Sequence, residues 1–124
     1  MCGRYTYYSS AEILEKLGMS KKQNEQIKLG FDFPDNFNVA PGQEMQVIVR
    51  GEQEHTLEYM TWGIVPSWSK TPESKLKLIN ARAEGLLEKS MWKRLVSTKR
   101  CIVPARGFYE WKTENGKKSP YYIT

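Results

Sequence analysis

The sequence contains little of what metal sites and disulfide-stabilised folds require. It has one histidine, His55, and two cysteines, Cys2 and Cys101, among 124 residues. No C-x-x-C pair is present, and disulfide frameworks in chains this short normally use several bridges. We therefore expect no metal, no cofactor and no stabilising disulfide. Cys101 lies in an apolar run and is predicted to be a buried small hydrophobe, and His55 is assigned no catalytic role.

Long apolar runs are also missing from the sequence. No stretch approaches the roughly 20 apolar residues that a membrane-spanning helix needs, and none has the pattern of a signal peptide. We therefore expect no membrane partner and predict a cytoplasmic location.

Positive charge and aromatic side chains are what the sequence has in excess. The formal net charge is +5 and the pI is about 9.2, with basic residues spread along the chain. A basic folded surface suits an anionic partner, although a well-solvated surface explains the charge equally well. Four Trp and seven Tyr favour the first interpretation. Exposed aromatic rings beside basic groups bind single-stranded nucleic acid, because bases stack on the rings and phosphates pair with the cations.

The β-prone runs and turns predict an α+β fold, with mainly antiparallel strands in a sheet or barrel-like core and a few peripheral helices. Strands are expected at 3–8, in a hairpin over 45–63, at 101–112, and at 119–124 after an Asn115–Gly116 turn. Helices are expected at 9–18, more weakly at 20–30, and over 83–96, with Leu86, Leu87, Met91 and Leu95 buried. Residues 31–43 are predicted to be loop.

The chain length allows one domain at most, comprising residues 1–124. The sequence ends at "YYIT", inside the second strand of a predicted hairpin. An apolar strand edge of this kind normally pairs with another strand. We therefore expect a second chain, or a missing C-terminal segment, to complete the sheet.

Cys2 carries the most reactive chemistry in the sequence. Removal of the initiator Met would leave a thiol and an α-amine on adjacent carbons, and the amine has an ordinary pKa of about 7.7–8.0. Such an aminothiol can capture an aldehyde as a Schiff base and close a thiazolidine, or the amine can serve as base for the thiol. In an extended strand Arg4 shares its face and adds a permanent positive charge. The alternative interpretation is an incidental cysteine at a frayed chain end.

Five stretches of the sequence resemble one family. "MCGRY" at 1–5, "NVAPGQ" at 38–43, "WGIVPSW" at 62–68, "NARAE" at 80–84 and "RCIVPARGFYEW" at 100–111 are similar to the SRAP domain, named for SOS response-associated peptidase activity. They occur in the family's order and cover the chain to about residue 111. The resemblance implies a DNA damage response protein that binds single-stranded DNA and crosslinks to abasic sites through a thiazolidine on its N-terminal cysteine.

The resemblance also implies residue roles. Cys2 would be the nucleophile, Asn80 would hold the opened sugar by hydrogen bonding, and Glu110 would move protons as general acid–base and assist release. The implied DNA contacts are Arg4, Arg82, Trp68, Trp111 and Asn38. Strict strand alternation places Glu110 and Trp111 on opposite faces, so the strand either ends or bulges there, or Trp111 is structural. Pro41 and Gly42 are expected to shape a loop.

One part of the family pattern has no counterpart in the sequence. The family's site also contains a histidine well beyond "GFYEW", and the family domain is nearly twice as long. These residues therefore resemble its N-terminal portion.

Two alternatives to abasic-site capture stay open. One is a thiol peptidase, hydrolase or lyase that uses Cys2, including on its own leader. The other is a non-catalytic DNA-binding remnant.

Overall fold

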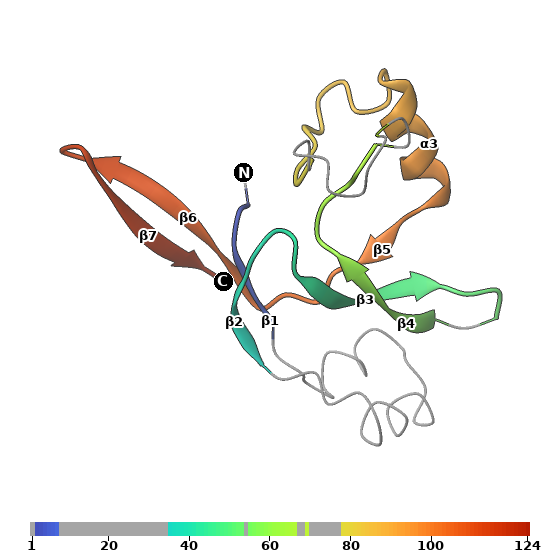
Figure 1. Ribbon diagram of the computed structural model, residues 1–124, viewed down its shortest axis with the longest axis horizontal. Helices are drawn as coiled ribbons and strands as arrows, with labels where there is room; N and C mark the ends of the chain where they lie inside the picture. The colour runs from blue at the N-terminus through green and yellow to red at the C-terminus, as the bar shows by residue number, and fades with distance from the viewer. Residues whose placement is uncertain (1, 8–34, 54, 67–68, 70–77) are drawn as a thin grey trace.

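The described strands form two antiparallel sheets. The computed structural model describes residues 2–7, 35–53, 55–66, 69 and 78–124. One sheet has the strand order β2-β1-β6-β7 and the other β4-β3-β5 (Figure 1). The strands are β1 (Tyr5–Tyr7), β2 (Asn36–Val39), β3 (Glu44–Arg50), β4 (His55–Thr61), β5 (Cys101–Ile102), β6 (Gly107–Glu114) and β7 (Lys117–Ile123). The predicted α+β class with antiparallel strands is confirmed, and these strands do not close into a barrel within the described ranges.

The predicted hairpin over 45–63 is confirmed as β3 and β4. The two strands pair without interruption from Glu44↔Thr61 to Arg50↔His55. On its other edge β3 pairs with β5, which makes β3 the central strand of its sheet. Four consecutive residues, 45–48, are buried as a result, whereas β4 is exposed except at Leu57.

The N-terminal strand is shorter than predicted, and residues 31–43 are not all loop. Only Tyr5–Tyr7 form β1, and Asn36–Val39 form β2 beside it. The loop prediction was therefore wrong at β2, because Pro34 and Pro41 flank a short Asn-rich run that gains its strand geometry from pairing with β1. The loop prediction holds at Pro41–Gly42, where Gly42 adopts φ 87° in a turn.

The single strand predicted over 101–112 is two strands that belong to different sheets. β5 pairs with β3, whereas β6 pairs with β1 and β7. Residues 103–106 between them, which include buried Pro104, are not strand. A proline cannot donate a hydrogen bond to a strand ladder, so the crossing between sheets falls where pairing is already interrupted.

The turn at Asn115–Gly116 is confirmed. Both residues have positive φ, 50° and 75°, which is the conformation that a two-residue hairpin turn requires. β6 and β7 pair in continuous register from Phe108↔Ile123 to Glu114↔Lys117. The hairpin projects from the rest of the molecule (Figure 1), and residues 111–123 are exposed along it.

One helix, α3 (Ser90–Thr98), lies within the described residues, and it begins later than predicted. Residues 84–88 form turns, because Gly85 has φ 68°, outside the helical region. Its predicted core positions are not buried: Leu87 is 60% exposed, and Leu86, Met91 and Leu95 are half-buried. The helices expected at 9–18 and 20–30 lie outside the described residues. No helix in the described part of the chain is long and apolar enough to cross a membrane.

The core lies where β1 meets β3. Tyr5, Tyr7, Val39 and Met45 form one buried cluster. Burial of the two tyrosines leaves polar atoms to satisfy, and the Tyr7 hydroxyl donates to the Gln46 Oε1 at 2.9 Å. The Gln46 amide in turn donates to the Tyr59 hydroxyl at 3.2 Å. This chain of hydrogen bonds joins the two sheets and satisfies a buried glutamine.

Cys101 departs from its prediction. It lies in β5 at the edge of the three-stranded sheet and is exposed, not buried. The first two residues of the apolar run that suggested burial form β5, and among the described strands β5 pairs only with β3. Partial burial of the thiol by neighbouring atoms still raises the pKa of Cys101.

Candidate active site

Cys2 lies beside the core, just ahead of β1. The residue is half-buried and packs against the cluster of Tyr5, Tyr7, Val39 and Met45. Its thiol donates a hydrogen bond to the Arg4 carbonyl at 3.4 Å. A frayed chain end would not have these contacts, so the structure favours a positioned cysteine over an incidental one.

Asn80 holds Cys2 by its backbone. The Asn80 side-chain amide Nδ2 donates to the Cys2 carbonyl at 2.8 Å, across 78 residues of sequence. Both residues are half-buried. The sequence resemblance assigned Asn80 to the sugar, whereas here one of its two Nδ2 hydrogens is bonded to the Cys2 carbonyl. The second Nδ2 hydrogen and the Oδ1 atom are the groups of this amide to consider for a bound sugar.

Trp62 is a residue of the site that the sequence analysis passed over. Its indole Nε1 donates to the Ile79 carbonyl at 3.0 Å, directly before Asn80. Its ring packs against Tyr5 with centroids 5.5 Å apart and planes at 60°. The sequence shows only the indole N–H, which every tryptophan has; that the Trp62 ring is half-buried, and so needs a partner for this donor, is known only from the fold.

The register of β6 decides how Glu110 and Trp111 lie. Tyr5 pairs with Phe108, and the Tyr109 N–H donates to the Arg4 carbonyl at 2.9 Å, which extends the pairing toward Cys2. Side chains alternate along β6, so Glu110 shares the face of Phe108 and Tyr5, and Trp111 has the opposite face.

No bulge interrupts the β6–β7 pairing at these residues. Trp111 is 43% exposed and Glu110 is half-buried. The explanation that the strand ends or bulges there was therefore wrong. Trp111 is not a core residue, and its role as a DNA contact stays a prediction.

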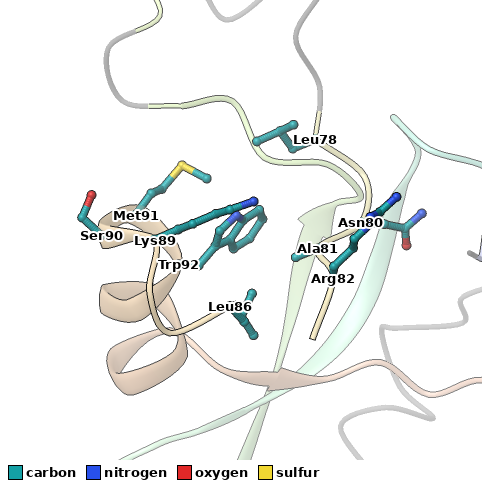
Figure 2. Close-up of a pocket in the computed structure, with 9 residues that line it drawn as sticks. All are labelled: Leu78, Asn80, Ala81, Arg82, Leu86, Lys89, Ser90, Met91 and Trp92. Carbon is teal, nitrogen blue, oxygen red and sulfur yellow. The ribbon is translucent and has the colours of Figure 1, made fainter. Parts of the chain in front are cut away.

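The two arginines of the candidate site differ in exposure. Arg4 is half-buried, and its Nη1 donates to the Gly3 carbonyl at 2.8 Å. Residues 2–4 lie outside β1, so the strand face that we expected Cys2 and Arg4 to share does not form there. Arg82 is exposed and follows Asn80 by two residues. Figure 2 shows the side chains of Asn80 and Arg82 pointing away from α3.

The remaining predicted DNA contacts are less closely tied to Cys2. Asn38 is exposed on β2, and its backbone N–H donates to the Asn36 Oδ1 at 2.9 Å. Trp68 lies outside the described residues. His55, which was given no role, is exposed at the start of β4.

A pocket of about 670 Å³ lies between α3 and the segment 78–82 (Figure 2). Leu86 and Trp92 form part of its wall, and Lys89 reaches across it. Asn80 and Arg82 border it. Cys2 is not among its lining residues, so this pocket lies next to the thiol's surroundings and does not contain the thiol.

The tyrosines beneath Cys2 show how dry this region is. Burial raises the pKa of Tyr5 to about 12, with smaller contributions from the neighbouring Tyr7 and Cys2. The pKa of Tyr7 is raised too, chiefly by burial and then by Tyr59 and Asp35. Both phenols therefore stay neutral at physiological pH and act as packing and hydrogen-bonding groups.

The described residues offer no metal centre. Within those ranges, no group of three or more His, Cys, Asp or Glu side chains lies close enough together to hold a metal ion. The chemistry that these residues can supply is that of a thiol, an amide and a carboxylate.

Comparison with known proteins places this chain among relatives with a shared name. The abasic site processing protein YoaM of Bacillus subtilis is 36% identical over 118 residues, which is 94% of this chain and 50% of the relative. The abasic site processing protein YedK of Escherichia coli is 32% identical over 99% of this chain and 53% of its own length. The abasic site processing protein HMCES of Xenopus tropicalis is 46% identical over 56% of this chain and 22% of its own.

The chain thus spans about half the length of the bacterial relatives that it matches. The family model described as SOS response associated peptidase (SRAP) matches residues 1–124. The family that the five sequence stretches resembled is therefore confirmed, and this chain belongs to the SRAP family.

Proposed function

We propose that the protein captures abasic sites in single-stranded DNA covalently through Cys2 and so protects the lesion. The observation that carries this proposal is the hydrogen bond from Asn80 to the Cys2 carbonyl, which fixes the aminothiol-bearing residue at the surface of a dry core. The names of the relatives support the lesion as substrate, since each is called an abasic site processing protein.

The chemistry needs only groups that the chain supplies once the initiator Met is removed. The ring-opened sugar presents an aldehyde carbon, which the Cys2 amine attacks to form an imine with loss of one water. The thiol sulfur then adds to the imine carbon, and its proton passes to the nitrogen. The product is a five-membered thiazolidine that joins DNA and protein.

Glu110 is the proposed proton carrier for both steps. It shares the sheet face of Tyr5, against which Cys2 packs, and the β1–β6 register extends from Tyr5 toward Cys2. A half-buried carboxylate there can accept a proton as the amine attacks and return it as water leaves. Because the imine steps are reversible, the same group would assist release.

DNA binding is assigned to basic, aromatic and amide side chains that the family resemblance implies as DNA contacts. Arg4 and Arg82 would contact phosphates, which fix the strand without reading its sequence. Trp111, Asn38 and Trp68 are the further proposed contacts, with stacking worth roughly 1–3 kcal/mol per base. The net charge of +5 favours such an anionic partner. We place the protein in the cytoplasm, associated with DNA.

The decisive experiment is a denaturing gel of the protein with single-stranded DNA that carries one abasic site. Intact mass first confirms that Met1 is absent. We expect a denaturation-resistant band with abasic DNA and none with an undamaged strand. Cys2→Ala should abolish the band, whereas Cys101→Ala is the matched control and should leave it unchanged, because the Cys101 thiol lies in the other sheet.

Other outcomes assign the protein to a different class. Salt-sensitive DNA binding that is indifferent to Cys2→Ala would indicate a non-catalytic binding module. Cysteine-dependent cleavage of peptides with no crosslink would indicate a thiol peptidase, an activity that the name of the family includes.

A further inference from the structure

Trp62 lies at the junction between the two sheets, and the proposed reaction gives it no role. It follows β4 in the three-stranded sheet, whereas Cys2 precedes β1 in the four-stranded sheet. Both residues nevertheless pack against the same core cluster. The junction between the sheets therefore includes the surroundings of the thiol.

Two hydrogen bonds lead from the Trp62 indole to Cys2. The indole Nε1 donates to the Ile79 carbonyl at 3.0 Å, and the next residue, Asn80, donates from Nδ2 to the Cys2 carbonyl at 2.8 Å. The peptide unit after Ile79 is rigid and planar. An indole that fixes this carbonyl therefore limits how Asn80 can rotate away from Cys2.

The backbone around Trp62 is itself held in place. The Trp62 N–H donates to the Gln43 carbonyl at 2.9 Å, and the Gly42 N–H donates to the Trp62 carbonyl at 2.8 Å. The segment that ends in Asn80 pairs with the chain two residues beyond Trp62, through the mutual hydrogen bonds of Ile64 and Leu78 at 3.0 and 3.2 Å. The indole hydrogen bond adds a further link between these two segments, directly before Asn80.

We propose that Trp62 is a positioning residue for aldehyde capture: its indole N–H holds the Ile79 carbonyl so that Asn80 keeps Cys2 in the reactive position. This inference rests on the proposed function. Trp62 touches no reacting atom in this scheme, so it acts on the rate of crosslinking and not on the affinity for DNA. A small displacement of a positioned nucleophile is enough to slow a reaction substantially.

The test compares Trp62→Phe, which keeps a ring and removes the N–H, with Trp92→Phe on α3 as the matched control. Single-turnover crosslinking gives a maximal rate and a half-saturating DNA concentration. We expect Trp62→Phe to lower the maximal rate about fivefold, the loss typical of one neutral hydrogen bond, with the half-saturating concentration unchanged. Trp92→Phe should change neither. In an Asn80→Ala background, Trp62→Phe should have no further effect, since the two residues act through one path.

A second measurement does not depend on crosslinking. Hydrogen exchange of the Asn80 side-chain amide, followed by NMR, reports its bond to Cys2 directly. We expect faster exchange in Trp62→Phe than in wild type and Trp92→Phe. Unchanged exchange, or a normal crosslinking rate in Trp62→Phe, overturns the inference. A wild type that forms no crosslink refutes the proposed function instead, and the exchange result then still decides whether Trp62 positions Asn80.

Discussion

Gly107 is the position where one added methyl group should damage both the fold and the site. A Cβ atom at this residue would lie 2.6 Å from the Ile123 carbonyl oxygen and 2.6 Å from both Cζ and the hydroxyl of Tyr122. Real Cβ atoms do not approach other atoms so closely, so β7 must move. The movement would also break the 2.7 Å hydrogen bond between the Tyr122 and Thr6 hydroxyls.

The expected cost follows from these two effects. Overpacking of a well-packed position costs typically about 1–3 kcal/mol, and the lost hydrogen bond adds about 1 kcal/mol. Gly107→Ala should therefore lower the free energy of unfolding by about 2–4 kcal/mol. For a chain of this size that corresponds to a fall in Tm of roughly 8–16 °C.

Urea unfolding measures this loss, with Gly3→Ala as the control. A Cβ atom at Gly3 meets nothing within 4 Å. Both substitutions remove the same backbone freedom from the unfolded chain, so that contribution cancels in the comparison. Equal urea midpoints for Gly107→Ala and Gly3→Ala, at equal m-values, would refute the reasoning.

Gly107→Ala should also affect crosslinking, because Gly107 lies in the short pairing of β1 with β6. Gly107 pairs with Thr6, and Phe108 with Tyr5. These two pairs set how far along β6 the carboxylate of Glu110 lies relative to Cys2. We therefore expect the Gly107→Ala protein to crosslink abasic DNA more slowly even at a temperature where it is fully folded.

Two further predictions concern Tyr5 and Asn80. The pKa of folded Tyr5, about 12, exceeds its ordinary value of 10, so the unfolded chain loses this proton first as pH rises. The contribution of Tyr5 to stability is complete below pH 10 and is lost between about pH 10 and 12. Across that range the Tm of Tyr5→Phe should fall less steeply with pH than the Tm of the wild type. Identical slopes for the two proteins would contradict this prediction. For Asn80, we expect Asn80→Asp to slow crosslinking more than Asn80→Ala, which should cost up to about tenfold. A carboxylate would face the Cys2 carbonyl without a proton to donate. An Asp variant as fast as the Ala variant would contradict this repulsion, and an Ala variant as fast as the wild type would show that the contact is unimportant.

The sequence by itself determined the features that local chemistry controls. Two β-prone runs around a polar turn predicted the 45–63 hairpin, and Asn115–Gly116 predicted the second one, because few residues tolerate positive φ. The family could be identified from five short stretches, since Cys2 and the "NARAE" and "GFYEW" stretches keep their order along the chain. Gly42 was expected to shape a loop, and its φ of 87° confirms it.

The tertiary structure decided what depends on partners distant in sequence. No local pattern shows that residues 101–112 divide between two sheets, because pairing with β3 and with β1 is a long-range choice. Cys101 was predicted to be buried from its apolar neighbours, but the edge position of β5 exposes it.

The same reasoning applies to the candidate site. The sequence could nominate Asn80, but only the fold shows its amide on the Cys2 carbonyl, and only the fold brings the Trp62 indole to Ile79. Residue types are fixed by the sequence, whereas a hydrogen bond across 78 residues exists only once both sheets have packed around their shared core.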